Sequence, residues 1–270
     1  MESIRQAVER AKLSAESHGV GASDVYRRHP LTDISPFRSA SLSSVELNAA
    51  HLQKHRILAH DGKDVAARPF DLLRAEVLRS MDLKGWRILA VTSPTPSCGK
   101  TFTALNLAMS IARQADREVC LVDLDFRRPQ IATSLGLKSG HGVTSVLEGR
   151  SELHNAMVQV RIGSTRLEVM PTTTSVNSSD LSSSLALKKL LQDVAGYERS
   201  RITIVDLPPM LAGHDVISIL PQIDCVLLVA AVGTTKTSEI EDCKKYLENS
   251  DIVRVVLNKV PQSNNTFAYY

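Results

Sequence analysis

The chain has 270 residues, 43% of them hydrophobic, which is enough for one domain of about 200 residues plus an appendage. The formal net charge of +3 is close to balance and gives no case for binding nucleic acid or a membrane surface. No apolar run approaches the roughly 20 residues that span a bilayer, and the charged N-terminus does not resemble a signal peptide, so we expect a cytoplasmic protein.

The cysteines are widely spaced and match no metal or redox pattern. They are Cys98, Cys120, Cys225 and Cys243. Because Cys120 and Cys225 fall inside apolar runs, we expect both in the core.

The N-terminal quarter of the chain contains two segments of different composition. Residues 1–18 carry apolar side chains at helical spacing and predict an amphipathic helix. Residues 19–64 are interrupted by glycine, proline and serine and predict a flexible linker, with a helical turn near residues 45–58. His51 and His55 would share a face of that turn, but no Cys or acidic partner at ligand spacing supports a metal pair.

Residues 69–81 predict a helix, because Pro69 suits a first helical turn and the apolar residues recur on one side. Asp71, Arg74 and Arg79 lie beside that apolar side. The helix can be an ordinary docking helix or a surface for self-association, and the sequence does not decide between them.

Residues 86–112 predict a strand, a phosphate-binding turn and a helix. Apolar residues 86–93 fit a buried strand, and residues 102–112 are apolar at helical spacing. The turn between them ends in Gly99-Lys100-Thr101, so backbone N–H groups at the helix N-terminus can hold a phosphate. Lys100 adds a positive charge, and the Thr101 hydroxyl can join the shell of a Mg²⁺ ion. The residues expected to contact the nucleotide are Ser97, Cys98, Gly99, Lys100, Thr101 and Phe102.

Two later strands are also expected to end in acidic residues. The run 119–122 leads to Asp123 and Asp125, and the run 202–205 leads to Asp206. Strands are expected as well at residues 166–170, 225–231 and 253–258, and helices at 178–195 and 237–249. This alternation predicts an α/β fold with a doubly wound, mainly parallel sheet and helices on both faces.

The carboxyl ends of neighbouring parallel strands meet at one edge of a sheet, so the three acids should lie near the phosphate-binding turn. Like charges so close would raise one another's pKa, and a bound Mg²⁺ would remove that conflict. The candidate metal ligands are Thr101, Asp123 and Asp206, and Asp123 is the candidate proton acceptor for an incoming hydroxyl.

In this order the three segments resemble the Walker A, A′ and B motifs of bacterial tyrosine kinases, the autokinases of capsule and exopolysaccharide export. The resemblance rests on Gly99-Lys100-Thr101, on residues 122–129 and on residues 205–209, and it covers about residues 68–260. It implies a MinD-like P-loop NTPase fold, with ATP and Mg²⁺ as cofactors. Residue by residue, it implies that Lys100, Asp123 and Asp125 are catalytic and that Asp206 serves the metal.

The resemblance also implies partners and a division of the chain. It implies a membrane-spanning polysaccharide co-polymerase as a separate activator chain, which would bring this chain to the inner membrane. It implies a homo-oligomeric ring without nucleic acid, and phosphorylation of the C-terminal tyrosines, here Tyr269 and Tyr270. The expected kinase domain is 65–262, followed by a tyrosine tail at 263–270.

The phosphate-binding turn departs from the family pattern, because the family commonly has Pro-Gly-Glu/Asp-Gly-Lys where this chain has Pro96-Ser97-Cys98-Gly99-Lys100. If the position of Ser97 needs a positive φ, serine costs about 1 kcal/mol there.

Two alternative functions stay open. A MinD/ParA-like positioning ATPase shares all three motifs, although Thr95 stands where such proteins have a second lysine. A catalytically weak regulatory module of the export machinery would also explain the altered turn.

Overall fold

The structure is a computed structural model that describes residues 42–114, 116–138, 140–175, 185–196, 201–248 and 250–261. All of them belong to one compact unit, Ser39–Tyr270. The helix expected at 1–18 and the tyrosines at the C-terminus lie outside the described residues. Of the helices in the described residues, none has both the length and the hydrophobicity needed to cross a membrane.

An eight-stranded sheet organises this unit, with the strand order β1-β4-β5-β3-β6-β2-β7-β8. Every neighbouring pair is parallel except β4 and β5, which are antiparallel. The predicted mainly parallel sheet is therefore confirmed. The strands are β1 Ser43–Glu46, β2 Ile88–Thr92, β3 Glu118–Asp123, β4 Val158–Ile162, β5 Thr165–Met170, β6 Arg201–Asp206, β7 Cys225–Ala231 and β8 Asp251–Asn258.

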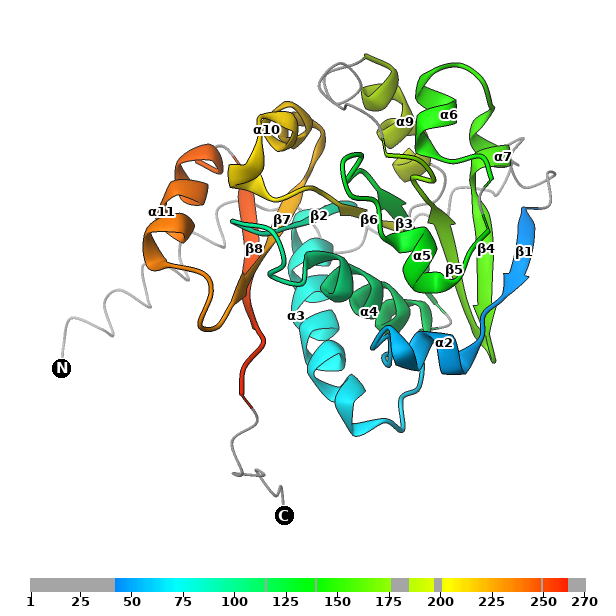
Figure 1. Cartoon of the computed structure of the whole chain (residues 1–270), viewed down its shortest axis with the longest axis horizontal. Helices are drawn as coiled ribbons and strands as arrows, with labels where there is room; N and C mark the ends of the chain where they lie inside the picture. The colour runs from blue at the N-terminus through cyan, green and yellow to red at the C-terminus, as the bar shows by residue number, and fades with distance from the viewer. Residues whose placement is uncertain are drawn as a thin grey trace, which may run out of the picture. The chain divides into compact units, whose positions relative to one another are not determined.

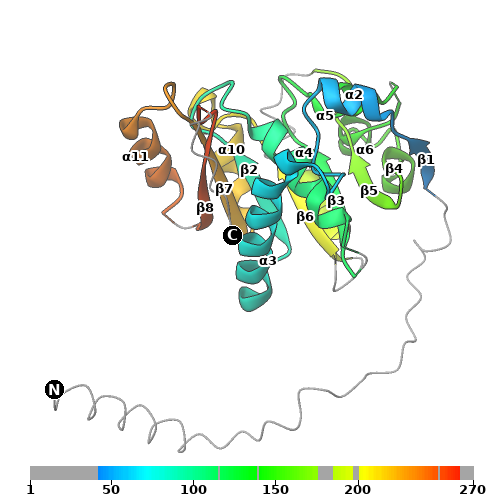
Figure 2. The same cartoon turned by 90° about the horizontal axis from the view of Figure 1, so that it is seen from below.

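Helices cover both faces of the sheet, with α3 and α4 on one side and α9 on the other (Figure 1). The α-helices are α2 Ala49–Lys54, α3 Arg68–Lys84, α4 Lys100–Ala112, α5 Ile131–Leu135, α6 Val143–Leu147, α7 Leu153–Ala156, α9 Leu185–Gly196, α10 Asp215–Ile219 and α11 Thr237–Tyr246. Short 3₁₀ turns are η2 Val65–Ala67, η3 Met210–Ala212 and η4 Leu220–Gln222. The view from below in Figure 2 shows α3 and α4 in front of the central strands.

The alternation of side chains along the central strands explains why two layers of helices are needed. Strand β3 sends Val119 and Leu121 into the core beneath α3 and α4, while Cys120 is also fully buried but points to the opposite face. Strand β6 is buried along its whole length in the same way. A central strand that is apolar on both faces is typical of a doubly covered parallel sheet.

Residues 42–64 differ from the flexible linker expected over 19–64. Strand β1 pairs in parallel with β4, and Leu52 of α2 is fully buried. The side chain of Asn106, on α4, accepts the backbone N–H groups of Leu58 and Ala59 at 2.9 and 3.1 Å. All four residues of β1 are exposed, because it is an edge strand held by backbone pairing. Such a strand leaves no alternation of apolar residues in the sequence.

Helix α3 confirms the predicted helix over 69–81 and is fixed to α4 by one carboxylate. Asp71 accepts hydrogen bonds from Ser110 Oγ and Arg113 Nη2, both at 2.6 Å, and from Arg74 Nη1 at 3.0 Å. These contacts keep the pKa of Asp71 below its usual range, because they outweigh the opposing effect of burial. Asp71 and Arg74 are therefore engaged within their own chain.

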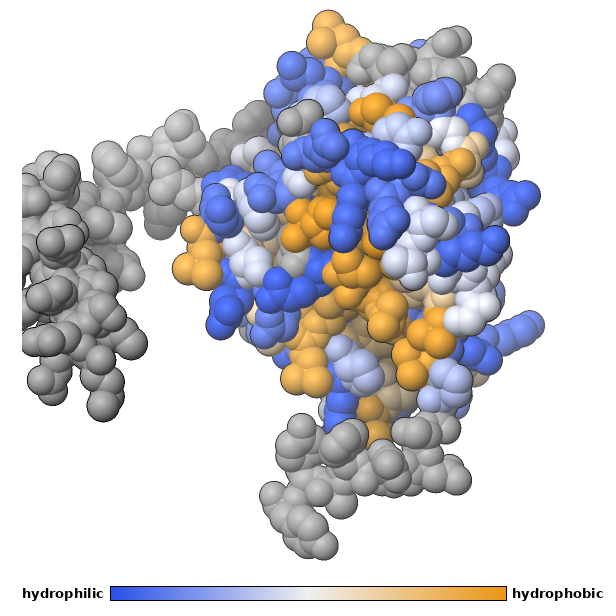
Figure 3. All heavy atoms as spheres, turned by 90° about the vertical axis from the view of Figure 1, so that its left-hand side faces the viewer, coloured by the Kyte–Doolittle hydropathy of each residue, from blue (hydrophilic) through white to orange (hydrophobic). Residues whose placement is uncertain are grey.

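Apolar side chains gather on the face that includes α11 and the edge strand β8 (Figure 3). Val255 and Leu257 of β8 and the following Val260 are exposed, and Leu72 of α3 is 72% exposed. Of these residues, only Leu72 belongs to the segment 69–81. Its exposure is compatible with a self-association surface on α3, which stays a prediction.

Candidate nucleotide site

The phosphate-binding turn connects β2 to α4, as the strand–turn–helix pattern predicts. Gly99 is the N-cap of α4 and has φ +97°, and Ser97 has φ +65°. Gly99 is required for space as well as for φ, because a Cβ there would overlap the side-chain amide of Asn258. That amide donates to the carbonyl oxygen of Cys98 at 2.9 Å, so the end of β8 holds the turn in place.

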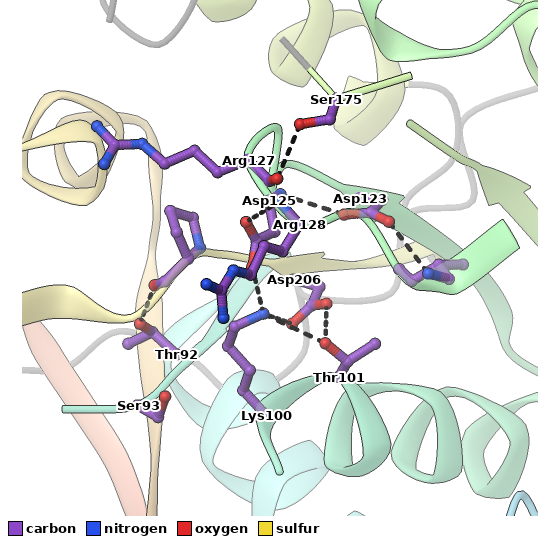
Figure 4. A network of polar contacts seen from close by, with 12 residues as sticks. Thr92, Ser93, Lys100, Thr101, Asp123, Asp125, Arg127, Arg128, Ser175 and Asp206 are labelled. Atoms are coloured by element: carbon purple, nitrogen blue, oxygen red, sulfur yellow. Dashed lines mark hydrogen bonds and ion pairs between the residues drawn. The ribbon is translucent and has the colours of Figure 1, made fainter. Parts of the chain in front are cut away.

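Lys100 begins α4 and points into a cluster of carboxylates (Figure 4). Its Nζ lies 2.7 Å from Oδ2 of Asp125 and 3.6 Å from Oδ1 of Asp206. Burial alone would lower the pKa of Lys100, but the carboxylates of Asp206 and Asp125 outweigh it and raise that pKa. Lys100 is therefore a fixed cation whose charge is shared between two acids.

Thr101 and Asp206 face one another across the same cluster. The Thr101 hydroxyl donates to Oδ2 of Asp206 at 2.6 Å. Oδ1 of Asp206 is buried and accepts no hydrogen bond within the described residues. Burial raises the pKa of Asp206, although Lys100 and the Thr101 hydroxyl oppose the shift.

Asp123 lies behind Asp125 rather than beside it. Its side chain is fully buried, and its oxygens accept the backbone N–H groups of Asp125 at 3.1 Å and Ile131 at 3.2 Å. Burial, followed by repulsion from Asp206, raises the pKa of Asp123 well above its ordinary value. Strands β3 and β6 pair with Asp123 opposite Asp206, as expected for acids at the carboxyl ends of neighbouring parallel strands.

A cavity of about 380 Å³ opens beside the turn. It is lined by residues of the turn and α4, of the segment after β3, and of the segment after β6. The lining residues are Pro96, Ser97, Gly99, Lys100, Thr101, Phe102, Asp125, Arg127, Arg128, Gln130, Pro208, Pro209, Ala212, Gly213 and Asp215. Five of the six predicted nucleotide contacts thus line one cavity, together with Asp125.

Cys98, the sixth predicted nucleotide contact, does not line the cavity. Its Sγ is fully buried and lies 3.5 Å from Oγ1 of Thr235 and 3.6 Å from Oγ1 of Thr95. Burial alone would raise the pKa of the Cys98 thiol, but the hydrogen bonds of Thr235 and Thr95 outweigh it and lower that pKa. The side chain of Cys98 therefore anchors the turn from below, and its backbone accepts the bond from Asn258.

The far wall of the cavity contains residues to which sequence reasoning assigned no role. They are Arg127, Arg128, Gln130 and Asp215. Arg127 and Arg128 directly follow the acidic strand end, and their position after a strand at the ligand-binding edge is the signal that would have found them. Asp215 follows β6 by nine residues, and no local pattern ties it to the site.

Oxygen donors are available for a divalent cation, although the acids alone do not enclose one. Among the described residues, no group of three or more His, Cys, Asp or Glu side chains could hold a metal ion. Oδ1 of Asp206 is nevertheless buried and accepts no hydrogen bond from the described residues, with Lys100 Nζ 3.6 Å away and the Thr101 hydroxyl on the other oxygen of the same carboxylate. Carboxylate and hydroxyl oxygens are ligands that Mg²⁺ accepts together with water and substrate phosphates, so these two residues fit that ion.

His51 and His55 do not form a metal pair. Their rings stack with centroids 4.4 Å apart, and Nε2 of His51 lies 3.0 Å from the carbonyl oxygen of Thr133. One ring nitrogen of the pair is therefore occupied by a backbone carbonyl of α5.

Comparisons with known proteins agree with this geometry. The model of the ParA family, described as NUBPL iron-transfer P-loop NTPase, matches residues 86–258. The chain is 30% identical to the tyrosine-protein kinase etk of Escherichia coli (strain K12), over 99% of this chain and 36% of that protein. It is 27% identical to the tyrosine-protein kinase YwqD of Bacillus subtilis (strain 168), over 82% of this chain and 93% of YwqD. The chain thus spans about a third of the first relative and nearly all of the second.

Solved structures give the same picture. The kinase domain of Escherichia coli tyrosine kinase ETK superposes with a TM-score of 0.70 at 26% identity, covering 86% of this chain and 96% of that domain. The septum site-determining protein MinD of Pyrococcus horikoshii OT3, complexed with Mg-ADP, superposes with a TM-score of 0.55 at 19% identity, covering 66% of this chain and 72% of MinD. At 19% identity the similarity to MinD shows only that the two proteins share a fold, and the bound Mg-ADP is a property of MinD.

Proposed function

The chain belongs to the ParA family of P-loop NTPases, and from that premise we propose that it is an ATP-dependent protein-tyrosine autokinase acting in exopolysaccharide synthesis or export. One observation carries the proposal. Lys100, Thr101 and Asp206 form one polar cluster at the P-loop cavity, in a chain whose relatives are named tyrosine-protein kinases. The iron transfer in the description of the family model has no support in the residues of this cavity.

The turn and the start of α4 would hold the phosphates of ATP. The backbone N–H groups of residues 97–101 lie at a helix N-terminus, where anions bind favourably. Lys100 is charged and fixed by its acidic neighbours, so it is ready to exchange one of them for a phosphate oxygen. Mg²⁺, when bound by Thr101 and Asp206, would neutralise charge on the phosphates.

Asp123 and Asp125 would serve the incoming tyrosine hydroxyl. Asp125 lines the cavity, whereas Asp123 is fully buried behind it. We propose that Asp123 accepts the proton, because it ends β3 in register with Asp206 and so lies at the sheet edge beside the metal-binding residues, where a bound Mg²⁺ would favour its ionised form. Asp125 would assist by holding Lys100 and by orienting the segment that follows β3.

The acceptors and partners are further parts of the proposal. Tyr269 and Tyr270 would be the phosphoacceptors. The proposed partner is a membrane-spanning polysaccharide co-polymerase, which would act on this chain as a separate activator chain. Such an activator would place this chain at the cytoplasmic side of the inner membrane. The exposed apolar residues on β8 and α3 support association of copies into a ring.

The test is phosphotyrosine detection by mass spectrometry. Purified full-length protein, incubated with MgATP, should become phosphorylated at Tyr269 or Tyr270. The variant Lys100→Met should remain unmodified, because it lacks the phosphate-binding cation. The double variant Tyr269→Phe/Tyr270→Phe should keep nucleotide binding and lose the modification.

Two other outcomes would replace the proposal. Hydrolysis of ATP without phosphotyrosine would favour the MinD/ParA-like positioning ATPase. Absence of nucleotide binding would favour a regulatory module, for which the positive φ of Ser97 is the favouring observation.

A further inference from the structure

Five charged side chains line the cavity, namely Lys100, Asp125, Arg127, Arg128 and Asp215. Four of them form two ion pairs. Nζ of Lys100 lies 2.7 Å from Asp125, and Nε of Arg127 lies 2.9 Å from Oδ2 of Asp215. Arg128 is the fifth, and its guanidinium forms no ion pair with any residue that the structure describes.

Arg128 is held at its backbone rather than at its charged end. Its N–H lies 3.0 Å from Oδ1 of Asp125 and 3.2 Å from the Asp125 carbonyl oxygen. The other carboxylate oxygen of Asp125 binds Lys100, so a single side chain holds the Lys100 ammonium and the backbone of Arg128. Figure 4 shows the Arg128 side chain directed toward the Lys100 end of the site, whereas Arg127 is directed away from it.

The phosphate-binding turn offers little positive charge to a nucleotide, so a second cation is needed to neutralise the phosphates. Lys100 is the only basic residue between Pro94 and Thr101, and two carboxylates already share its charge. A nucleoside triphosphate brings about one more negative charge than a diphosphate, and a guanidinium can bind two oxygens of one phosphate at once. Because Arg127 is occupied by Asp215, Arg128 is the cation on the far wall that can supply this contact.

We propose that Arg128 is a second phosphate-binding residue that contacts the terminal phosphate of a nucleoside triphosphate, so that the site binds a triphosphate in preference to a diphosphate. This inference rests on the proposed function, since it requires the cavity to bind nucleotide. It assigns a binding role to a residue outside the phosphate-binding turn. It also gives Asp125 a second task, because that carboxylate positions the backbone of Arg128.

The experiment is isothermal titration calorimetry on the full chain in the presence of Mg²⁺, with AMP-PNP as the triphosphate and ADP as the diphosphate. Loss of a charge-assisted hydrogen bond should weaken AMP-PNP binding to Arg128→Ala by about tenfold or more. ADP binding should change by less than about twofold, because the missing contact is to the terminal phosphate. Arg128→Lys keeps the charge and should recover part of the loss.

Arg166→Ala is the matched control, because Arg166 is an exposed arginine on β5 outside the cavity. It removes the same charge from the protein and should change neither affinity. Retained ADP binding shows that Arg128→Ala is folded.

The outcomes separate the two proposals. If the wild type binds both nucleotides, two results contradict the role of Arg128: Arg128→Ala weakens AMP-PNP and ADP binding equally, or it weakens neither. Nucleotide binding by the cavity stands in both cases. If the wild type binds neither nucleotide, both the proposed function and this inference are wrong.

Discussion

Oδ2 of Asp125 lies 2.7 Å from Nζ of Lys100, so the site supplies its own counter-ion to the lysine of the phosphate-binding turn. The pair is almost fully buried, with side-chain exposures of 11% for Lys100 and 5% for Asp125. A phosphate that binds Lys100 must therefore compete with a carboxylate already in place.

Removal of this counter-ion should strengthen binding of a nucleotide without metal. We expect Asp125→Asn to raise the affinity for ADP in EDTA by about fivefold, because a negative charge near the phosphates is lost. Calorimetry with and without Mg²⁺ measures the effect. Asp193→Asn removes a charge of the same sign from an exposed position of α9 outside the cavity and serves as the control. An affinity for ADP that is unchanged in Asp125→Asn would show that Asp125 does not oppose phosphate binding.

Stability should depend on pH through the two carboxyls with raised pKa values, Asp123 and Asp206. The folded state keeps these protons to a higher pH than the unfolded chain, where an aspartate titrates near about 4. Their contribution to stability is therefore complete below about pH 4 and is lost as the pH rises through the raised values. Lys100, whose pKa is also raised, adds to this slope only at strongly alkaline pH.

Asp123→Asn should flatten this dependence, because it removes one of the two titrating groups. Urea midpoints measured from about pH 5 to 8 should fall less steeply for the variant than for the wild type. The variant also loses one acceptor for the backbone N–H of Asp125 or Ile131, so its midpoint should be lower at acidic pH. Asp193→Asn, on an exposed position of α9, should leave the slope unchanged. Equal slopes for Asp123→Asn and the wild type would contradict the assignment.

Cysteine labelling should distinguish Cys98 from the other thiols. The pKa of Cys98 is lowered, whereas burial raises the pKa of Cys120, Cys225 and Cys243 to about 12. Because the thiolate is the reactive form, iodoacetamide at about pH 8 should modify Cys98 first. Peptide mass spectrometry over time gives the order. Cys98→Ser should remove the early product, and its persistence in that variant would show that another thiol is responsible.

The sequence was sufficient for six of the eight strands, the turn and the three acids because each leaves a local pattern. The interiors of β3 and β6 are mostly apolar and both strands end in aspartate, and α4 begins at Lys100 directly after Gly99. Strands β1 and β4 were not predicted. Strand β1 is an exposed edge strand that pairs only through its backbone, and its neighbour β4 is fully buried only at Val160. The burial of Asp123 behind Asp125 and the pairing of Arg127 with Asp215 depend on how segments far apart in the chain pack, which no local pattern reports.

The conformation of Ser97 gives the final prediction and bears on how well the turn functions. Serine at φ +65° is strained by about 1 kcal/mol, and glycine is not. We therefore expect Ser97→Gly to raise the melting temperature by at most about 2–4 °C, because the greater freedom that glycine gives the unfolded chain offsets part of the relieved strain. Ser97→Ala keeps the Cβ that causes the strain, so it should melt no higher than the wild type. Differential scanning calorimetry of the three proteins decides the matter. If alanine and glycine raise the melting temperature equally, the serine hydroxyl and not the backbone conformation is the source of the effect.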